Sequence, residues 1–271
     1  MNLELNSENR VEALAKLFEA EKLLENFQDR ALLDQILKFH QKTTWQYIGE
    51  ENLDLRLTRW LELVQFTDVL PEYYEQKIDF NVKKIKLNEG RSKRTFKKNG
   101  VIDFNQLGEI LYESFGLSEG SLSKPYPSAG ALYPIIPLLL VLDENAVERD
   151  FLPGSYVFDS HEARLLMIKK FDQEEILKIK KNIYGESLSG IAICYSIDIR
   201  RSIAKYRSRG YRHALIEVGL MAQSFRSTLE RHKGFGECTW SGFNDNALSS
   251  ILGLSPRLSP VVLVQWFGEI S

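Results

Sequence analysis

Apolar residues follow helical and strand periods in different parts of the chain. From about Glu8 to His40 they recur every three or four residues, which predicts amphipathic helices. Between Gln41 and Leu87 no clean period is visible, and the pattern predicts no element there. Farther on, short apolar segments bounded by turn residues predict strands. The predicted strands cover residues 135–142, 155–158, 164–169, 190–197 and 260–267.

Helices are predicted between and after these strands. Asp103 fits an N-cap position, and Gln106 three residues later fits the matching position of a capping box. The helix that they begin ends near Gly116, and a loop rich in Ser, Pro and Gly follows from Ser118 to Pro134. The other predicted helices cover residues 173–181, 199–207, 211–233 and 244–252.

The order of these elements predicts an α+β core after a helical N-terminal segment. In the last long helix an apolar stripe should face that core. The stripe comprises Leu215, Val218, Met221, Ala222, Phe225 and Leu229. Neither a repeat nor a low-complexity linker marks a sharp boundary, so Asn88 is a working division. It separates a helical or docking segment, residues 1–87, from the core domain, residues 88–271.

Charge and composition exclude several classes of protein. The 271-residue chain carries 35 basic and 37 acidic side chains, a net charge of −2, which does not favour nucleic acid as a partner. The N-terminus lacks the features of a secretory signal, and the longest apolar run, near Pro134–Leu142, is too short to cross a membrane. Cys194 and Cys238 stand in no metal-ligand spacing. We therefore expect no metal site and two reduced, buried thiols in the cytoplasm.

The run Arg91-Ser92-Lys93-Arg94 is the first candidate site. A guanidinium group can bond two phosphate oxygens at once, and a serine hydroxyl adds a neutral donor. Arg91, Ser92 and Arg94 therefore suit a phosphate group. The alternative interpretation is a solvated run of charges that precedes a helix.

The second candidate site is the loop Pro127-Ser128-Ala129-Gly130-Ala131, which continues as Leu-Tyr-Pro. Prolines hold the chain extended, and small residues let another group approach the backbone closely. A flat ring could lie against such a surface, with backbone amides reaching its polar edge. The alternative is a rigid turn that leads into the strand at Ile135.

Lys205 and Tyr206 form the third candidate site, because they place a proton acceptor and a hydrogen-bond donor side by side. Gly210 is expected to break the helical run after them. The alternative is a basic, solvent-exposed helix end, where the helix dipole favours cations.

The fourth candidate site is Ser241-Gly242, where Gly242 lets the backbone turn and Asn244 can cap the next helix. The alternative is an ordinary strand-to-helix connection. The sequence contains no glycine-rich dinucleotide fingerprint, no P-loop and no G-x-S-x-G serine elbow. Hydrolase and nucleotide-hydrolysing functions are therefore unsupported.

Taken in order, the four candidate sites resemble motifs of the nitroreductase family. In that family an R-S-x-R element binds the phosphate and ribityl chain of FMN, which implies this role for Arg91, Ser92 and Arg94. A P-S-S-x-N-x-Q-P loop of the family lies over the flavin of the partner protomer, and residues 127–134 occupy its place here. Ser241-Gly242 resembles the family's segment beside the flavin N5 edge.

Two departures, Ala131 and Tyr133, indicate a subgroup, because common nitroreductases have asparagine and glutamine there. The loop P-S-A-G-A-L-Y-P is similar to that of the SagB-type azoline dehydrogenases, including those of microcin-type synthetases. Their proposed catalytic pair is a lysine next to a tyrosine, which Lys205 and Tyr206 match. The likeness covers residues 88–268.

This resemblance implies an FMN-dependent dehydrogenase that converts peptide thiazolines and oxazolines to thiazoles and oxazoles. Its product would be a ribosomally made modified peptide such as a bacteriocin. The resemblance also implies a homodimer, a cyclodehydratase partner and a precursor peptide. Residues 1–87 are candidates for docking those partners, or for a helical cover on the core. The alternatives are an NAD(P)H-dependent nitroreductase or quinone reductase, and a non-catalytic scaffold subunit of a synthetase complex.

Overall fold

The computed structural model divides the chain into two units, which are described separately. It describes residues 7–44, 55–65, 67–73, 75–80, 90, 92–98, 100–118, 120, 123–148, 151–183 and 189–270. One unit comprises Met1–Trp45 and Ser92–Ser271, and the other comprises Gln46–Arg91. The second unit contains helix α3 (Leu55–Val64), in a segment where the sequence pattern predicted no element.

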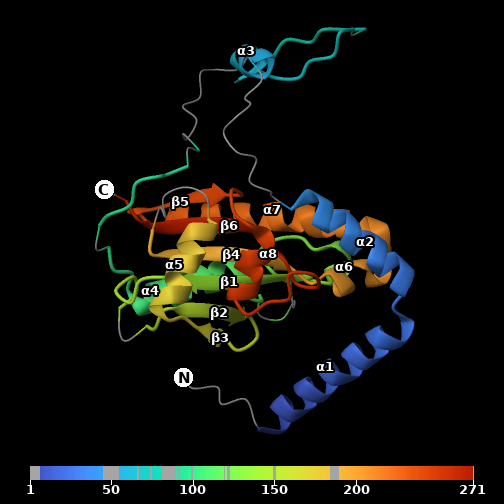
Figure 1. Ribbon diagram of the computed structural model, residues 1–271, viewed down its shortest axis with the longest axis vertical. Helices are drawn as coiled ribbons and strands as arrows, with labels where there is room; N and C mark the ends of the chain where they lie inside the picture. The colour runs from blue at the N-terminus through green and yellow to red at the C-terminus, as the bar shows by residue number, and fades with distance from the viewer. Residues whose placement is uncertain are drawn as a thin grey trace. The chain divides into compact units, whose positions relative to one another are not determined.

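A six-stranded antiparallel sheet forms the centre of the first unit (Figure 1). Its strand order is β3-β2-β1-β4-β6-β5, and every neighbouring pair runs antiparallel. The strands are β1 (Ile135–Val141), β2 (Gly154–Asp159), β3 (Arg164–Lys170), β4 (Ile191–Ile197), β5 (Phe235–Trp240) and β6 (Val261–Glu269). The strands predicted from the apolar segments are confirmed, and β5 is an additional strand.

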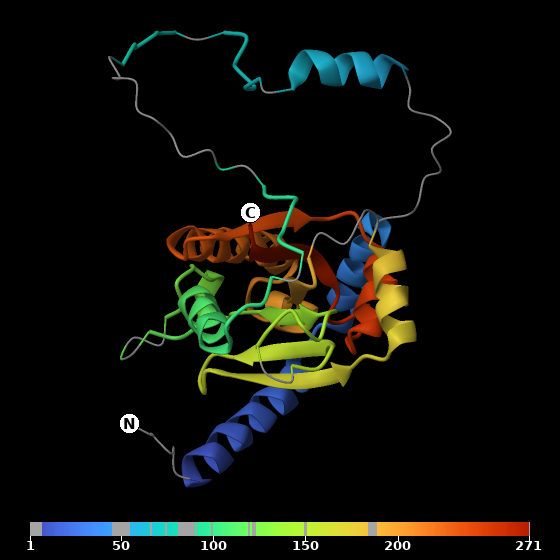
Figure 2. The ribbon, with the colours of Figure 1, turned by 90° about the vertical axis from the view of Figure 1, so that its left-hand side faces the viewer.

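Helices cover both faces of this sheet (Figure 1 and Figure 2). The helices of the first unit are α1 (Ser7–Phe27), α2 (Arg30–Thr43), α4 (Phe104–Phe115), α5 (Gln173–Asn182), α6 (Ile199–Tyr206), α7 (Ser208–Arg231) and α8 (Asp245–Ile251). Successive strand residues point to opposite faces. Leu139 and Val141 accordingly pack with α4 and α7, whereas Leu138 and Leu140 pack with α5 and α8. The predicted α+β class is therefore confirmed.

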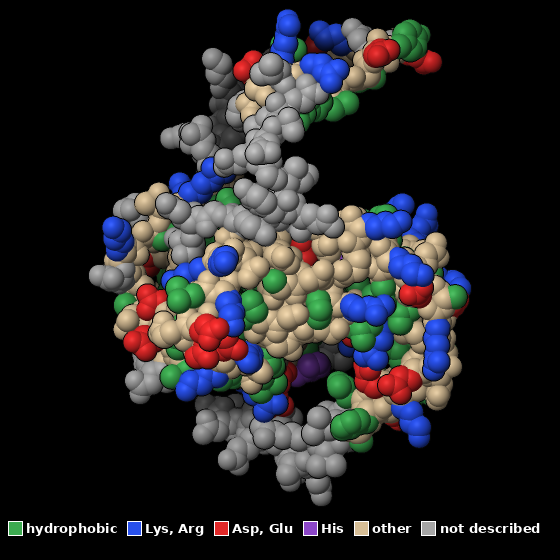
Figure 3. Space-filling model, in the orientation of Figure 1, with side chains coloured by type: hydrophobic (Ala, Val, Ile, Leu, Met, Phe, Trp, Pro, Cys, Tyr) green, Lys and Arg blue, Asp and Glu red, His purple; other side chains and the backbone are tan. Residues whose placement is uncertain are grey.

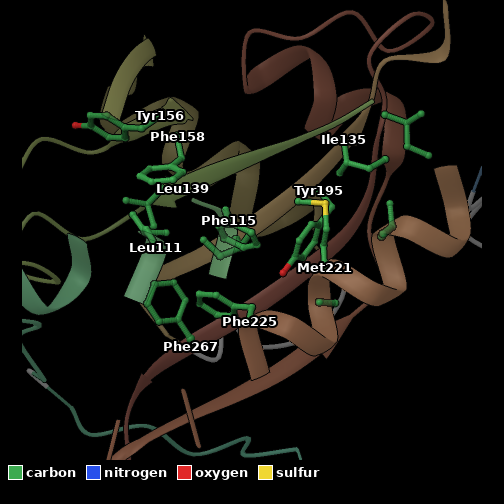
Figure 4. Packing of buried hydrophobic residues seen from close by; sticks show 14 of the residues in the cluster. Leu111, Phe115, Ile135, Leu139, Tyr156, Phe158, Tyr195, Met221, Phe225 and Phe267 are labelled. Carbon is green, nitrogen blue, oxygen red and sulfur yellow. The ribbon is translucent and has the colours of Figure 1, made fainter. Parts of the chain in front are cut away.

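Aromatic rings fix α4 and α7 to the sheet (Figure 4). Phe115 of α4 stacks on Phe225 of α7 with ring centroids 5.7 Å apart, and Phe225 meets the edge of Phe267 at 5.0 Å. Tyr195 of β4 approaches Phe115 edge-on at 6.2 Å. All four side chains are buried. Because burial of one such ring contributes roughly 1.5–3 kcal/mol, this cluster holds α7 firmly in place.

Two predicted helix caps are present in the structure. The Asp103 carboxylate accepts the backbone N–H of Gln106 at 2.8 Å at the start of α4. The Asn244 side chain accepts the N–H of Ala247 at 3.0 Å at the start of α8. These bonds satisfy amide groups that a helix leaves without internal partners, so the sequence locates both helix starts correctly.

Helix α2 is attached to the core by a buried polar contact. His40 Nδ1 lies 2.8 Å from Tyr211 Oη of α7, and burial lowers the pKa of His40. The Gln41 side chain also donates to the Asn246 side chain and to the Pro256 carbonyl. Helix α2 thus packs with the core domain, while a docking role for residues 1–87 stays a prediction.

None of the helices in the described ranges combines the length and apolar character needed to cross a membrane. Cys194 and Cys238 are both buried and free. Burial raises the pKa of the Cys194 thiol, which keeps it protonated.

Candidate functional site

The loop before β1 has an unusual backbone conformation. It contains a single 3-10 turn, Ala129–Ala131. Gly130, Ala131 and Tyr133 all have positive φ, at 66°, 53° and 46°. This region costs an L-residue about 1–2 kcal/mol, so neighbouring groups must hold Ala131 and Tyr133 in place.

Ser128 connects both ends of this loop to helix α7. Its hydroxyl donates to Glu217 Oε2 at 2.6 Å and accepts the Tyr133 N–H at 2.9 Å. Its carbonyl accepts the Ala131 N–H at 3.1 Å. The loop is therefore fixed through one side chain that reaches α7.

Helix α6 holds the end of the loop. Arg201 Nε donates to the Leu132 carbonyl at 2.6 Å, and the Asp198 N–H donates to the Pro134 carbonyl at 2.8 Å. Because Lys205 and Tyr206 form the last residues of α6, the loop and this pair belong to one assembly.

Gly130 lies directly against Lys205 and Tyr206. A Cβ atom on Gly130 would lie 2.7 Å from Tyr206 Oη and 3.0 Å from Lys205 Nζ. With glycine at this position, these polar groups can lie against the loop backbone without being displaced. The structure thus brings together two candidate sites that lie far apart in the sequence.

The tyrosine of this pair has contacts on two further sides. Lys205 Nζ lies 5.2 Å from the centroid of the Tyr206 ring, within the range of a cation–π interaction. The His213 ring meets Tyr206 nearly edge-on at 5.0 Å. His213 Nδ1 is buried and has no hydrogen-bond partner among the described residues. Sequence reasoning did not single out His213, since its position becomes visible only when α7 folds back on α6.

Glu217 is a charged residue at a core position of α7. It is only 2% exposed, and burial raises the pKa of its carboxyl, against the opposing effects of Ser128, Lys124 and Arg201. The neighbouring Tyr126 hydroxyl is buried without a hydrogen-bond partner among the described residues. Burial, followed by the nearby Glu217 charge, raises the pKa of Tyr126. The helix through Glu217 also resembles the subgroup, but no sequence pattern connects Glu217 with Tyr126, although a carboxylate on the apolar face of a helix is a usable signal.

The backbone between α6 and α7 corrects the expectation for Gly210. The break between the helices lies at Arg207, with φ 53° and ψ −138°, and Gly210 is inside α7. A Cβ atom on Gly210 would collide with the backbone carbonyl of Ser202 in α6. The glycine therefore permits close packing of the two helices and does not interrupt α7.

The remaining predicted residues flank β5. Ser92, Lys93 and Arg94 are exposed, and the Lys93 N–H donates to the Glu237 carbonyl of β5 at 2.8 Å. Ser241-Gly242 directly follows β5, where Trp240 Nε1 donates to the Gly242 carbonyl at 3.0 Å. Arg91 lies outside the described residues. Within the described ranges, no hydrogen bond or ion pair joins this group to the loop or to Lys205 and Tyr206.

A buried polar network connects β5 with α7. Glu237 forms an ion pair with Arg226 of α7 and accepts a hydrogen bond from Gln265 Nε2 at 2.8 Å. Tyr195 Oη donates to Gln265 Oε1 at 2.6 Å. Because the buried Glu237 carboxylate has partners on several sides, it holds β5 in position. The segment around Lys93, which bonds to the Glu237 carbonyl, is positioned with it.

Basic side chains gather on the side of the unit formed by α2 and α6 (Figure 3). Exposed members on α6, on α7 and at the break between them are Arg201, Lys205, Arg207, Arg209 and Arg212. Two of them already have partners, since Arg207 forms an ion pair with Asp29 and Arg201 donates to the Leu132 carbonyl. No group of three His, Cys, Asp or Glu residues in the described ranges is arranged to hold a metal ion.

Comparisons with known proteins agree with this architecture. Residues 88–268 match the model of the nitroreductase family. The microcin B17-processing protein McbC of Escherichia coli is 28% identical over 173 residues, which are 63% of this chain and 63% of that protein. The match therefore covers less than two thirds of that relative. The structure of the E. coli microcin synthetase McbBCD complex with truncated pro-MccB17 bound contains a similar chain, with a TM-score of 0.75 and 24% identity. That match covers 92% of this chain and 96% of the other, and it shows a shared fold.

The contact between Gly130 and the Lys-Tyr pair predicts a specific effect of Gly130→Ala. The left-handed backbone should cost about 1 kcal/mol of unfolding free energy. The new methyl group should also displace the flexible ends of Lys205 and Tyr206. Urea unfolding measures the first effect, and the NMR signal of a labelled Tyr206 ring measures the second.

Gly234→Ala is the matched control, because Gly234 has φ 90° and open space around it. It should lose a similar free energy of unfolding and leave the Tyr206 signal unchanged. A Tyr206 signal that does not move in Gly130→Ala would contradict the described contact.

Proposed function

The chain belongs to the nitroreductase family, and on that premise we propose that it is an FMN-dependent azoline dehydrogenase. It would oxidise thiazoline and oxazoline rings of a ribosomally made peptide to thiazoles and oxazoles. The observation that carries the proposal is the approach of Gly130 to Lys205 and Tyr206. The similarity to McbC, a microcin B17-processing protein, supports the same class of reaction.

The residues present fit FMN as the cofactor. Gly130 and Ala131 are small, exposed residues, and such residues let a flat ring approach the loop backbone. Ser92 and Arg94 are exposed beside β5 and provide donors for a phosphate, with Arg91 as a further predicted donor. Bound FMN supplies the two-electron oxidation that no side chain of the protein can perform.

Lys205 and Tyr206 would handle the proton that leaves the azoline ring. Conversion of an azoline to an azole removes two ring hydrogens, one of them as a proton. Lys205 Nζ or Tyr206 Oη would accept or relay that proton, since both atoms meet at the loop surface. A positioned acid or base of this kind contributes about 10²–10⁴-fold in rate.

The sequence leaves two other functions open. An NAD(P)H-dependent nitroreductase or quinone reductase does not account for a lysine and a tyrosine held against the loop. A non-catalytic scaffold subunit needs no such contact either. The Gly130 geometry therefore favours the dehydrogenase.

The proposal includes partners. We propose a cyclodehydratase that makes the azoline rings and a precursor peptide that carries them, both in the cytoplasm. A fold match across 92% of this chain to a structure of a microcin synthetase complex supports an assembly of this kind. Residues 1–87 are the proposed docking segment.

We also propose that the protein is a homodimer. Helix α7 exposes an apolar stripe in which Leu215 is 42%, Ile216 56% and Leu220 39% exposed. Gly219 in the same stripe has open space where a Cβ would point, so a second chain could approach the helix closely. An exposed apolar stripe of this kind suits a self-complementary interface.

The variants Lys205→Ala and Tyr206→Phe should retain FMN and lose most turnover of an azoline peptide, by about 10²-fold or more, because proton transfer is impaired. Steady-state kinetics with a synthetic thiazoline peptide measure the loss. Lys233→Ala, an exposed lysine after α7, is the control and should turn over normally. Normal turnover in both Lys205→Ala and Tyr206→Phe would refute the assignment.

Ile216→Glu should convert the homodimer to monomers, because it places a charge in the proposed apolar interface. Sedimentation velocity of the flavin-loaded protein measures the change. Leu177→Glu on α5, at a side chain that is 65% exposed, should leave the dimer intact. Wild-type protein that sediments as a flavin-loaded monomer would disprove the dimer.

A further inference from the structure

Glu217 lies in the first half of α7 with a side chain that is almost fully buried. Its Oε2 atom accepts a hydrogen bond from Ser128 Oγ at 2.6 Å. Its Oε1 atom is buried and has no hydrogen-bond partner among the described residues. Burial of a carboxylate is unfavourable. Packing alone therefore does not explain why a glutamate occupies this buried position.

The contact extends from Glu217 through Ser128 to the far end of the loop. The same Ser128 hydroxyl that donates to Glu217 accepts the Tyr133 N–H at 2.9 Å. A hydroxyl that must donate to the carboxylate is oriented with its lone pair free for Tyr133. The acceptor on α7 therefore determines how the two ends of the loop are held together.

Between these two ends the backbone turns toward the Lys-Tyr pair. Gly130 and Ala131 adopt left-handed conformations there, and Gly130 meets Tyr206 Oη and Lys205 Nζ. Helix α6 restrains the neighbouring Leu132 carbonyl through Arg201. Without the contact to α7, the α6 contact alone would leave residues 128–131 free to relax from this strained conformation.

We propose that Glu217 is a positioning residue of the dehydrogenase. Acting through Ser128, it fixes the loop of residues 128–134 so that Gly130 keeps the ends of Lys205 and Tyr206 in place for proton transfer. No hydrogen bond or ion pair among the described residues joins Glu217 to Lys205 or Tyr206, so Glu217 acts on the pair through the loop. The catalytic part of this inference rests on the proposed function, whereas the structural part concerns the loop alone.

The lysine and arginine near Glu217 are consistent with this role. Lys124 and Arg201 both oppose the rise in the pKa of Glu217 that burial causes. Lys124 also lies over the Tyr133 ring, with Nζ 5.2 Å from the centroid. The two charges near the carboxylate thus come from the segment that leads into the loop and from the helix that restrains it.

Amide hydrogen exchange of the peptide that covers residues 128–134 tests the structural part without any substrate. Glu217→Ala should raise exchange in this peptide by about tenfold, because the lost hydrogen bond no longer restrains the loop. Glu217→Gln should leave exchange near the wild-type rate, since an amide oxygen can still accept the Ser128 hydroxyl. Glu230→Ala, an exposed carboxylate on the same helix, is the control and should not change exchange.

Kinetics with a thiazoline peptide test the catalytic part. Glu217→Ala should lower kcat by about tenfold with little change in KM, and Glu217→Gln should restore kcat. Ser128→Ala should show the same loss, and the double variant Ser128→Ala/Glu217→Ala should be no worse than either single variant. Ser128 lies outside the helices, so this variant also provides the test if Glu217→Ala does not fold.

Unchanged exchange in Glu217→Ala or Ser128→Ala would overturn the inference, as would a Glu217→Gln variant as impaired as Glu217→Ala. Full additivity of the two alanine variants would also contradict it. If the wild type does not oxidise azolines but exchange changes as expected, the proposed reaction fails and the positioning of the loop by Glu217 stands.

Discussion

Helix α7 is held against the sheet by a continuous aromatic core, and the site depends on this packing. Phe225 lies between Phe115 and Phe267, with ring centroids 5.7 and 5.0 Å away. The same helix contacts the loop before β1 through Glu217 in its first half and β5 through Arg226 in its second half. Because close packing leaves α7 little freedom, both contacts are made from one rigid support.

The loop before β1 depends on its surroundings for its shape. Ala131 and Tyr133 adopt positive φ angles that L-residues avoid, so hydrogen bonds from α6 and α7 must hold them. Gly130 is thereby brought against the lysine and tyrosine at the end of α6. The hydrophobic core thus acts on the proposed chemistry through short polar contacts that connect rigid helices to a strained loop.

The sequence predicted most elements of the core because burial leaves a periodic apolar pattern, as in β1. It failed where burial depends on a distant partner. Leu215 belongs to the predicted core stripe but is 42% exposed, whereas Glu217 is buried beside Ser128, 89 residues earlier. Within the candidate site, the family resemblance singled out the Lys-Tyr pair and the loop, but no pattern predicted that Gly130 touches the pair. That contact depends on how α6 packs beside the loop, which local periodicity does not record.

An absorbance spectrum of the protein reconstituted with FMN, with the released chromophore identified, tests most directly whether this chain is a flavoenzyme. Flavin absorption bands and equimolar release of FMN are the expected result, because Ser92 and Arg94 supply phosphate donors and the small, exposed residues Gly130 and Ala131 let a flat ring approach the loop backbone. A protein that stays colourless after reconstitution would show that these residues do not form an FMN site, and it would contradict the proposed function.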